Sequence, residues 1–458
     1  MHKRKKIEKI IISNENKIKI NSNEINKGDI FLALKGNNCH GNDFINDCIK
    51  KGAIFCITDK KIRIAKNNDK IFFINNLSKF LIDLAKKKRK LFRGKVIGIT
   101  GSAGKTTLKE SLGFCLKLKF KVSYSYKSYN NFLGVIISIL NMSLNSKFAI
   151  FELGTNNFGE IKKLVKYIYP SQIIITNIQS THLENFKNKK NIAKEKSDIF
   201  NSKYNNQKRR LFLNINSDFE NMLIQKAKKE NNLNLVLINE LNTKYFIKKI
   251  IDKNKFHRVY FSINKKKLVL NIKNPIRFRL INLLFCFAFF DQNSLKTNII
   301  TKWQKYLKPV DGRGLIHNIL INKKKIKVID ESYNSNPDTM KQSIDYFTNI
   351  KKKDSQKILI LGNMNELGKN TYKLHFKLLT ELDKSDFKFV ILCGEFFRRS
   401  IIKLDNPKNE FIYIENRNEI MKFLNKKIHN NDIILIKCSN STEINKFTNC
   451  LLTKGNSL

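Results

Sequence analysis

The sequence predicts an α/β protein of three domains, each built from a largely parallel sheet covered by helices. Three observations predict this class. Short apolar runs alternate with amphipathic stretches along the chain, one run leads through a glycine-bounded turn into a helix near residue 100, and polar residues follow where the apolar runs end. The length of 458 residues, with 41% apolar content, is enough for two or three separate cores.

Residues 1–90 are expected to form a small α/β domain. The runs GDIFLALKG and GAIFCIT read as strands, because they are rich in β-branched and aromatic residues, and FINDCIKK between them reads as a helix. A lysine-rich stretch, AKKKRKLFRG, is expected to be the joint that leads into the next domain.

Residues 91–308 are expected to form a central, doubly wound domain, and residues 309–458 a third domain of similar construction. The turn KPVDGRGLIH, Lys308–His317, looks like a hinge because it contains Pro and Gly. After it, KVIDESYNSNPDTM, KILILGNM, FVILCGE and DIILIKCS alternate with helical stretches, which predicts an open α/β sheet of the Rossmann type.

The stretch Lys95–Leu118 predicts a phosphate-binding loop. A strand, KVIGIT, runs into GSAGKTT, in which two glycines let the chain wrap around an anion, and the following helix offers free N–H groups. The compact spacing leaves open the alternative that the glycines only punctuate a turn, but the GKTT ending favours ATP binding. The residues expected to hold the nucleotide phosphates are Gly101, Ser102, Ala103, Gly104, Lys105, Thr106 and Thr107.

Polar residues at two further strand ends indicate where the rest of this site lies. FAIFE ends at Glu152, and IIITN ends at Thr176 and Asn177, with His182 shortly after. In a doubly wound sheet ligands bind at the carboxyl ends of the strands. Thr106 and Glu152 supply the oxygen ligands that Mg²⁺ prefers, and His182 is a further candidate, although each residue alone could be a structural cap.

The net charge of +50 raises a different possibility, a basic ATPase that acts on nucleic acid. The excess is scattered lysine among many Asn and Ile residues, without interleaved aromatic residues, so solvated surface lysines are favoured. The eight cysteines show no metal-ligand spacing, and no apolar run reaches the roughly 20 residues of a membrane span. We therefore expect a cytoplasmic protein with neither nucleic acid nor a membrane span among its partners, acting as a monomer.

Taken together and in order, the motifs resemble those of the Mur ligases over essentially the whole chain. They are GDIFLALKG and GAIFCIT in the first domain, then GITGSAGKTT, NNFLG, FELGTNNFGEI, HLENF and AKEKSDIF, and finally GR, YNSNP and LGNMNELG. HLENF and LGNMNELG look like the branch that adds D-alanyl-D-alanine. DNPK at Asp405–Lys408 is similar to a motif of another branch, but it stands in a polar loop and reads as coincidence.

The resemblance implies an ATP- and Mg²⁺-dependent peptide ligase of peptidoglycan precursor synthesis. Its substrates would be UDP-N-acetylmuramoyl-tripeptide, bound partly by the N-terminal domain, and D-alanyl-D-alanine. The tripeptide carboxylate would attack the γ-phosphoryl group, and the dipeptide amine would displace phosphate from the resulting acyl phosphate. A ligase that binds its ligands but turns over poorly remains an alternative, because several family positions differ.

By motif match, the resemblance also assigns roles to individual residues. Lys105 and Arg313 would contact phosphates, and Asn282, Asp330 and Asn334 would help to hold the nucleotide. Thr106, Glu152, His182 and Lys196 would serve magnesium, while Ser22, Asn130 and Asn131 would face the UDP-linked substrate. Lys196, in the register Lys-x-x-Ile-Phe, would be carbamoylated, whereas Lys194 would not. The positions that depart from the family pattern are Asn23, Ser128, Phe278, Arg279, Cys438 and Asn440.

Overall fold

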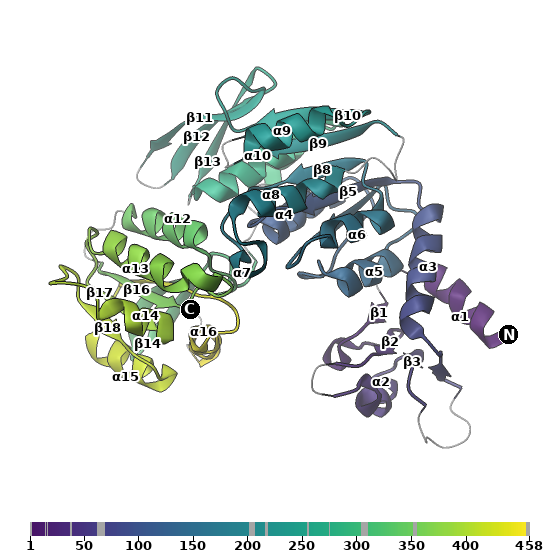
Figure 1. Ribbon diagram of the computed structural model, residues 1–458, viewed down its shortest axis with the longest axis horizontal. Helices are drawn as coiled ribbons and strands as arrows, with labels where there is room; N and C mark the ends of the chain where they lie inside the picture. Colours follow the sequence, from purple (N-terminus) through teal and green to yellow (C-terminus); the bar gives the residue numbers. More distant parts are fainter. Residues whose placement is uncertain are drawn as a thin grey trace.

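The computed structural model describes residues 2–13, 15, 17–36, 39–61, 69–200, 207–215, 219–253, 256–273, 275–303, 310–350 and 355–454. Three sheets follow one another along the chain, and the central one lies between the other two (Figure 1). The predicted three-domain α/β class is confirmed. The boundary predicted at residue 308 lies outside the described residues, as do Lys308 and Pro309 of the predicted hinge, so the domain limits stay predictions.

The N-terminal domain holds a four-stranded parallel sheet in the order β1-β2-β3-β4. Both predicted strands are present as β2 and β3, with helix α2 between them. The elements are α1 (His2–Ser13), β1 (Ile18–Lys19), η1 (Ser22–Glu24), β2 (Ile30–Ala33), η2 (Gly41–Phe44), α2 (Ile45–Lys50), β3 (Phe55–Thr58), β4 (Ile71–Phe73) and α3 (Leu77–Leu91).

The lysine-rich stretch predicted as a joint belongs for the most part to helix α3, and its place at a domain boundary stays a prediction. The helix forms because Phe80, Leu84 and Lys88, four residues apart, share one buried face. The Lys88 ammonium donates hydrogen bonds to the carbonyls of Leu140 at 2.5 Å and Ile11 at 3.2 Å. The segment is therefore a packed helix that ties the N-terminal helix to the central domain.

The central domain is built on a nine-stranded sheet in the order β13-β12-β11-β10-β9-β8-β5-β7-β6. Strands β5 to β10 pair in parallel, and alternate side chains enter the cores on the two faces. The elements are β5 (Lys95–Thr100), α4 (Lys105–Lys117), β6 (Val122–Tyr124), α5 (Phe132–Asn141), β7 (Phe148–Glu152), α6 (Glu160–Ile168), β8 (Gln172–Ile175), α7 (Leu183–Phe186), α8 (Lys189–Ser197), η3 (Asp198–Phe200), β9 (Arg209–Asn214), α9 (Glu220–Lys228), β10 (Leu233–Ile238), β11 (Tyr245–Asp252), β12 (His257–Ile263), β13 (Lys266–Ile272), α10 (Arg277–Gln292) and α11 (Asn298–Trp303).

Helix α10 contains the longest apolar run of the chain, and it is buried inside the protein. It packs with α4 against one face of the central sheet, where Phe285, Phe287 and Phe289 are fully covered. Among the described helices, none is long and apolar enough to cross a membrane.

The C-terminal domain holds a six-stranded sheet in the order β14-β15-β19-β16-β17-β18, in which only the β14–β15 pair is antiparallel. The four strands expected in this region are present as β15, β16, β17 and β19, and β14 and β18 are present in addition. The elements are β14 (Leu315–Ile321), β15 (Lys324–Glu331), α12 (Pro337–Thr348), β16 (Lys357–Gly362), η6 (Gly368–Asn370), α13 (Thr371–Leu382), β17 (Phe389–Cys393), α14 (Glu395–Ile401), β18 (Phe411–Tyr413), α15 (Arg417–Lys427), β19 (Ile433–Lys437) and α16 (Glu443–Lys454).

His375 on α13 supports the loop that follows β16. Its ring is fully buried, with Nε2 accepting a hydrogen bond from the Met364 amide at 3.1 Å and Nδ1 lying 2.8 Å from the Thr371 carbonyl oxygen. Nε2 must therefore be unprotonated and Nδ1 protonated. Burial lowers the pKa of His375 to about 4.

Acid should therefore destabilise this domain through His375. Its pKa is lower in the folded state than in the unfolded chain, so unfolding takes up a proton as pH falls from about 6.5 to 4. The free energy of unfolding should fall by at most about 1.4 kcal/mol per pH unit from this group. Hydrogen exchange of α13 between pH 7.5 and 5 measures it. His375→Gln should reduce the dependence of the unfolding free energy on pH, whereas His429→Gln, at an exposed site, should not. The same pH dependence in His375→Gln as in the wild type would contradict the role given to His375.

Candidate functional site

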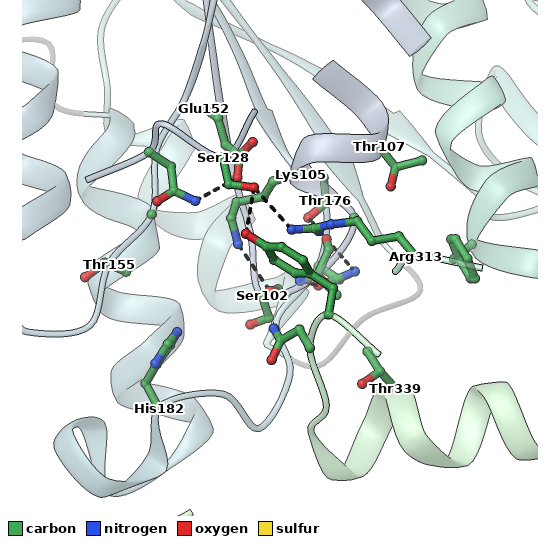
Figure 2. A pocket seen from close by; sticks show the side chains of 18 of the residues that line it. Ser102, Lys105, Thr107, Ser128, Glu152, Thr155, Thr176, His182, Arg313 and Thr339 are labelled. Atoms are coloured by element: carbon green, nitrogen blue, oxygen red, sulfur yellow. Dashed lines mark hydrogen bonds between the residues drawn. The ribbon is translucent and has the colours of Figure 1, made fainter. Parts of the chain in front are cut away.

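A cavity of about 480 Å³ lies at the carboxyl ends of the central strands, where the C-terminal domain meets the central domain (Figure 2). The central domain contributes the phosphate-binding loop and the segments after β6, β7 and β8. The C-terminal domain contributes the turn before β14, the start of α12 and the end of β19. The residues that line the cavity include Ser102, Ala103, Gly104, Lys105, Thr107, Ser128, Asn130, Asn131, Glu152, Asn177, His182, Phe278, Asn282, Arg313, Glu331, Tyr333, Asn334 and Lys437.

The loop between β5 and α4 has the conformation that an anion-binding turn needs. Gly101 and Gly104 have φ of 143° and 80°, and a Cβ on Gly101 would lie 1.9 Å from the Thr176 hydroxyl oxygen. The Asn177 side chain accepts a hydrogen bond from the Ala103 amide at 2.9 Å. The loop is thereby held against the end of β8.

Lys105, at the first position of α4, folds back over this loop. Its ammonium donates to the carbonyls of Gly101 at 2.7 Å and Ser102 at 3.2 Å. Desolvation lowers the pKa of Lys105 to about 8; the Glu152 carboxylate opposes this effect, and the Arg313 guanidinium adds to it. Two cations thus face the same small space, an arrangement that a polyanion such as a nucleotide phosphate would stabilise.

Lys196 lies buried on α8, whereas Lys194 is exposed on the same helix. Desolvation lowers the pKa of Lys196 far below its ordinary value; the nearby Lys105 cation lowers it further, and Glu195 acts in the opposite direction. Burial beside a second cation therefore favours the neutral amine over the ammonium.

Glu152 provides a buried carboxylate beside the loop. Its Oε1 accepts hydrogen bonds from the Thr106 hydroxyl at 3.1 Å and the Asn130 amide at 2.8 Å. Its Oε2 accepts none from the residues that the structure describes, and the nearest cation, the Lys109 ammonium, is 4.0 Å away. A buried carboxylate oxygen without a hydrogen-bond donor, next to a hydroxyl, fits a hard cation such as Mg²⁺.

Of the predicted metal ligands, Thr106 contacts Glu152, whereas His182 does not (Figure 2). His182 lies on the same cavity but away from Glu152 (Figure 2), and its Nδ1 is 2.5 Å from Oε2 of Glu366 in the C-terminal domain. Within the described ranges, no group of three or more His, Cys, Asp and Glu side chains could hold a metal. Thr106 and Glu152 fit a Mg²⁺ ion that keeps most of its waters, and the roles of His182 and Lys196 stay predictions.

The predicted nucleotide residues of the C-terminal half occupy different places. Asn282 and Asn334 line the cavity, and Nδ2 of Asn282 is buried without a hydrogen-bond partner among the described residues. Asp330 does not line it: its carboxylate accepts hydrogen bonds from the Gly312 amide and from the amide and hydroxyl of Ser332. Asp330 therefore fixes the turn that carries Arg313, and direct nucleotide contact by Asp330 stays a prediction.

The predicted substrate residues lie in two places, the cavity and the N-terminal domain. Asn130 and Asn131 line the cavity, and the Asn131 side chain also caps helix α5. Ser22 lies on η1 of the N-terminal domain, outside the cavity. Glu24 of the same turn accepts a hydrogen bond from Lys127 at 2.6 Å, so η1 is tied to the segment that leads to the cavity.

Comparison with known proteins places the chain in a family. Residues 16–89, 99–290 and 318–440 match the models described as the Mur ligase family catalytic domain, the Mur ligase middle domain and the Mur ligase glutamate ligase domain. The chain belongs to the Mur ligase family. This confirms the resemblance on which the sequence interpretation depended.

Two curated relatives of this Mur ligase carry the name UDP-N-acetylmuramoyl-tripeptide–D-alanyl-D-alanine ligase. The protein from Rickettsia prowazekii is 31% identical over 435 residues, which cover 94% of each chain. The one from Buchnera aphidicola is 28% identical and covers 96% of this chain and 94% of its own.

Solved structures show the same fold. MurF from Acinetobacter baumannii has a TM-score of 0.77 at 21% identity, covering 95% of this chain and 93% of its own. MurF ligase from Thermotoga maritima, in complex with ADP, has a TM-score of 0.76 at 22% identity, covering 97% and 98%.

The positions at which this Mur ligase departs from the family pattern are also located. Phe278 lines the cavity, whereas the Arg279 guanidinium donates to the Gly314 carbonyl in the turn before β14. The Cys438 thiol is directed at the Ser332 carbonyl, and Asn440 and Asn23 are exposed. Their effect on affinity stays a prediction.

Sequence reasoning missed several residues of this Mur ligase that shape the site. Lys109 is fully buried and donates to the carbonyls of Ser125 and Lys127. The Lys437 ammonium pairs with Glu331 at 2.9 Å. A lysine at the inward position of the helix after GKTT was a usable signal for Lys109, whereas the Glu331–Lys437 pair joins residues 106 positions apart and needed the fold.

Proposed function

We propose that this chain joins D-alanyl-D-alanine to UDP-N-acetylmuramoyl-tripeptide with the cleavage of ATP to ADP and phosphate. The observation that carries the proposal is that Lys105 and Arg313 face the same cavity beside the phosphate-binding loop and the buried carboxylate of Glu152. Such a surplus of positive charge suits the phosphates of ATP and an anionic acceptor. The names of the relatives supply the acceptor and the dipeptide.

In the first step, an oxygen of the tripeptide carboxylate attacks the γ-phosphorus of ATP. The new P–O bond forms as the bond to the β-phosphate oxygen breaks, so ADP leaves and an acyl phosphate results. Positioning and charge neutralisation dominate the catalysis of such a transfer. Lys105 and Arg313, which line the same cavity, would neutralise the oxygens of the transferred group.

In the second step, the amine of D-alanyl-D-alanine attacks the acyl carbon. The C–N bond forms, the amine loses a proton, and the C–O bond to phosphate breaks through a tetrahedral intermediate. The acyl phosphate and the dipeptide amine would therefore meet at this cavity. We propose that the monomer is the active form and that it works in the cytoplasm, where ATP is available.

Thr106 and Glu152 would hold a magnesium ion, and Lys196, once carbamoylated, would add oxygen ligands near it. Bound magnesium supplies a positive charge that offsets the charge of the phosphates. Asn130 bonds to Glu152 and lines the cavity, so it can orient both the carboxylate and the acceptor. Asn131, and Ser22 from the N-terminal domain, would face the UDP-linked substrate.

Release of phosphate by the purified protein tests the proposal. Phosphate should appear only when ATP and UDP-N-acetylmuramoyl-tripeptide are both present, because the attacking carboxylate belongs to the acceptor. The amide product should require D-alanyl-D-alanine as well. Nucleic acid should not stimulate the release; if it did, and the tripeptide did not, the basic ATPase would be the better description.

A further inference from the structure

We propose that Ser128 is a positioning residue for phosphoryl transfer. Its hydroxyl binds Arg313 of the C-terminal domain and so aligns the guanidinium with the phosphate-binding loop. The inference rests on the proposed function. Ser128 comes from the segment after β6 in the central domain, and it lines the cavity. Because sequence matching marked it only as a departure from the family pattern, no role followed from its sequence.

The hydroxyl of Ser128 is a point where both domains meet. The Tyr333 hydroxyl donates to it at 3.1 Å, and Nη2 of Arg313 donates at 3.5 Å (Figure 2). On its own domain, it lies 3.5 Å from the Thr106 hydroxyl. Ser128 thus connects the residue proposed for metal binding with the residue proposed for phosphate binding.

The hydrogen-bonding capacity of these hydroxyls fits a single direction of donation. Thr106 donates its proton to Glu152 at 3.1 Å, so its oxygen is an acceptor for Ser128. Ser128 then donates to Thr106 and accepts from Tyr333 and Arg313, which uses one donor and two acceptor sites. An alanine here would leave two donors of the C-terminal domain without their acceptor.

Arg313 depends on this contact for its orientation. Its guanidinium stacks on the ring of Tyr333 at 4.2 Å, and its Nε is buried without a hydrogen-bond partner among the described residues. The backbone of the same turn is fixed, because the Gly312 amide bonds to Asp330 and its carbonyl accepts from the Tyr333 amide at 3.1 Å. The base of the turn is therefore held by its own domain, and the outer end of Arg313 by Ser128.

Ser128 is itself held rigidly. Lys109 donates to the carbonyls of Ser125 and Lys127, and the Ser128 carbonyl accepts from the Asn130 amide at 2.7 Å. Asn130 in turn bonds to Glu152 at 2.8 Å. These contacts fix the Ser128 segment relative to Glu152. Through its hydroxyl, Ser128 then positions Arg313 relative to Glu152 as well.

Steady-state kinetics of phosphate release test the proposal with Ser128→Ala, Tyr333→Phe and the double variant. Ser128→Ala should lower kcat about tenfold or more, with less than a twofold change in KM for ATP, because geometry and not binding is lost. Ser128→Thr, which keeps the hydroxyl, should restore most of kcat. The double variant should lose about as much as the worse single variant, since both remove the same contact.

Tyr129→Phe is the matched control, because it removes a hydroxyl from the adjacent residue and should leave kcat within twofold. Wild-type kcat with unchanged KM in both Ser128→Ala and Tyr333→Phe would overturn the inference, as would independent, multiplying losses in the double variant. If Ser128→Ala fails to fold, Tyr333→Phe alone decides. A wild-type protein that releases no substrate-dependent phosphate would instead contradict the proposed function, and the inference with it.

Discussion

Lys105→Ala should abolish phosphate release by the purified protein. The ammonium lies over the phosphate-binding loop beside Arg313, and without it the charge that develops on the transferred phosphoryl group has lost its nearest cation. Removal of one such group typically costs about 10²- to 10³-fold in kcat, or several kcal/mol of transition-state stabilisation. Single-turnover measurement at saturating ATP isolates the chemical step.

Lys119→Ala provides the control, because Lys119 is exposed just beyond the same helix. It should leave kcat unchanged. Nucleotide binding, measured separately by calorimetry, should weaken in Lys105→Ala but not in the control. Full activity of the Lys105 variant would contradict the assignment of this loop to the nucleotide phosphates.

Lys196→Ala should also lose most activity. Burial and the neighbouring Lys105 lower the pKa of the Lys196 amine and so favour its neutral form, which is the form that can attack carbon dioxide. An N–C bond then forms, the amine loses a proton, and the product is a carbamate anion. An ammonium has no lone pair and repels a metal ion, whereas a carbamate offers oxygen ligands and negative charge.

Three comparisons make this prediction specific. Lys194→Ala, at the exposed lysine of the same helix, should keep wild-type turnover. Short carboxylates added to Lys196→Ala should restore part of the activity, because they can enter the space that the side chain leaves. The wild type should show a carbamate carbonyl signal with ¹³C-bicarbonate that the variant lacks. Normal turnover of Lys196→Ala in bicarbonate-depleted buffer would rule the carbamate out.

The elements around the site were predictable because their local signals agree. KVIGIT is an apolar run that ends in a glycine turn, and the structure has β5, Gly101, Gly104 and α4 in that order. The same holds for Glu152 at the end of β7. These residues come together because the carboxyl ends of parallel strands share one edge of a sheet.

The antiparallel strands were not predictable by the same reasoning. The β12–β13 and β14–β15 hairpins turn at Asn264–Lys265 and Asn322–Lys323, and all four residues have positive φ. Such two-residue turns are usually marked by glycine. In this lysine- and asparagine-rich chain an Asn-Lys pair looks like any other polar stretch, so the turns carried no visible signal.

Side-chain roles were predictable only where a motif fixes them. Asp330 follows the family pattern, yet its carboxylate bonds within its own turn, a fact that depends on how β15 meets Gly312. At the level of sequence, Ser128 appeared only as a departure from the family pattern. Its contact with Tyr333 joins residues 205 positions apart and exists only because two domains meet there.

The segment between β8 and α8 has a consequence for the energetics of binding. Asn177 and Gln179 bond to the phosphate-binding loop through Ala103 and Ser102, and the Ser180 amide and Lys189 bond to Asp338 of the C-terminal domain. The same segment therefore contacts both the phosphate-binding loop and the C-terminal domain. Thermodynamic linkage is reciprocal. If a bound nucleotide raises the equilibrium constant for contact between the two domains by some factor, that contact raises the affinity for the nucleotide by the same factor.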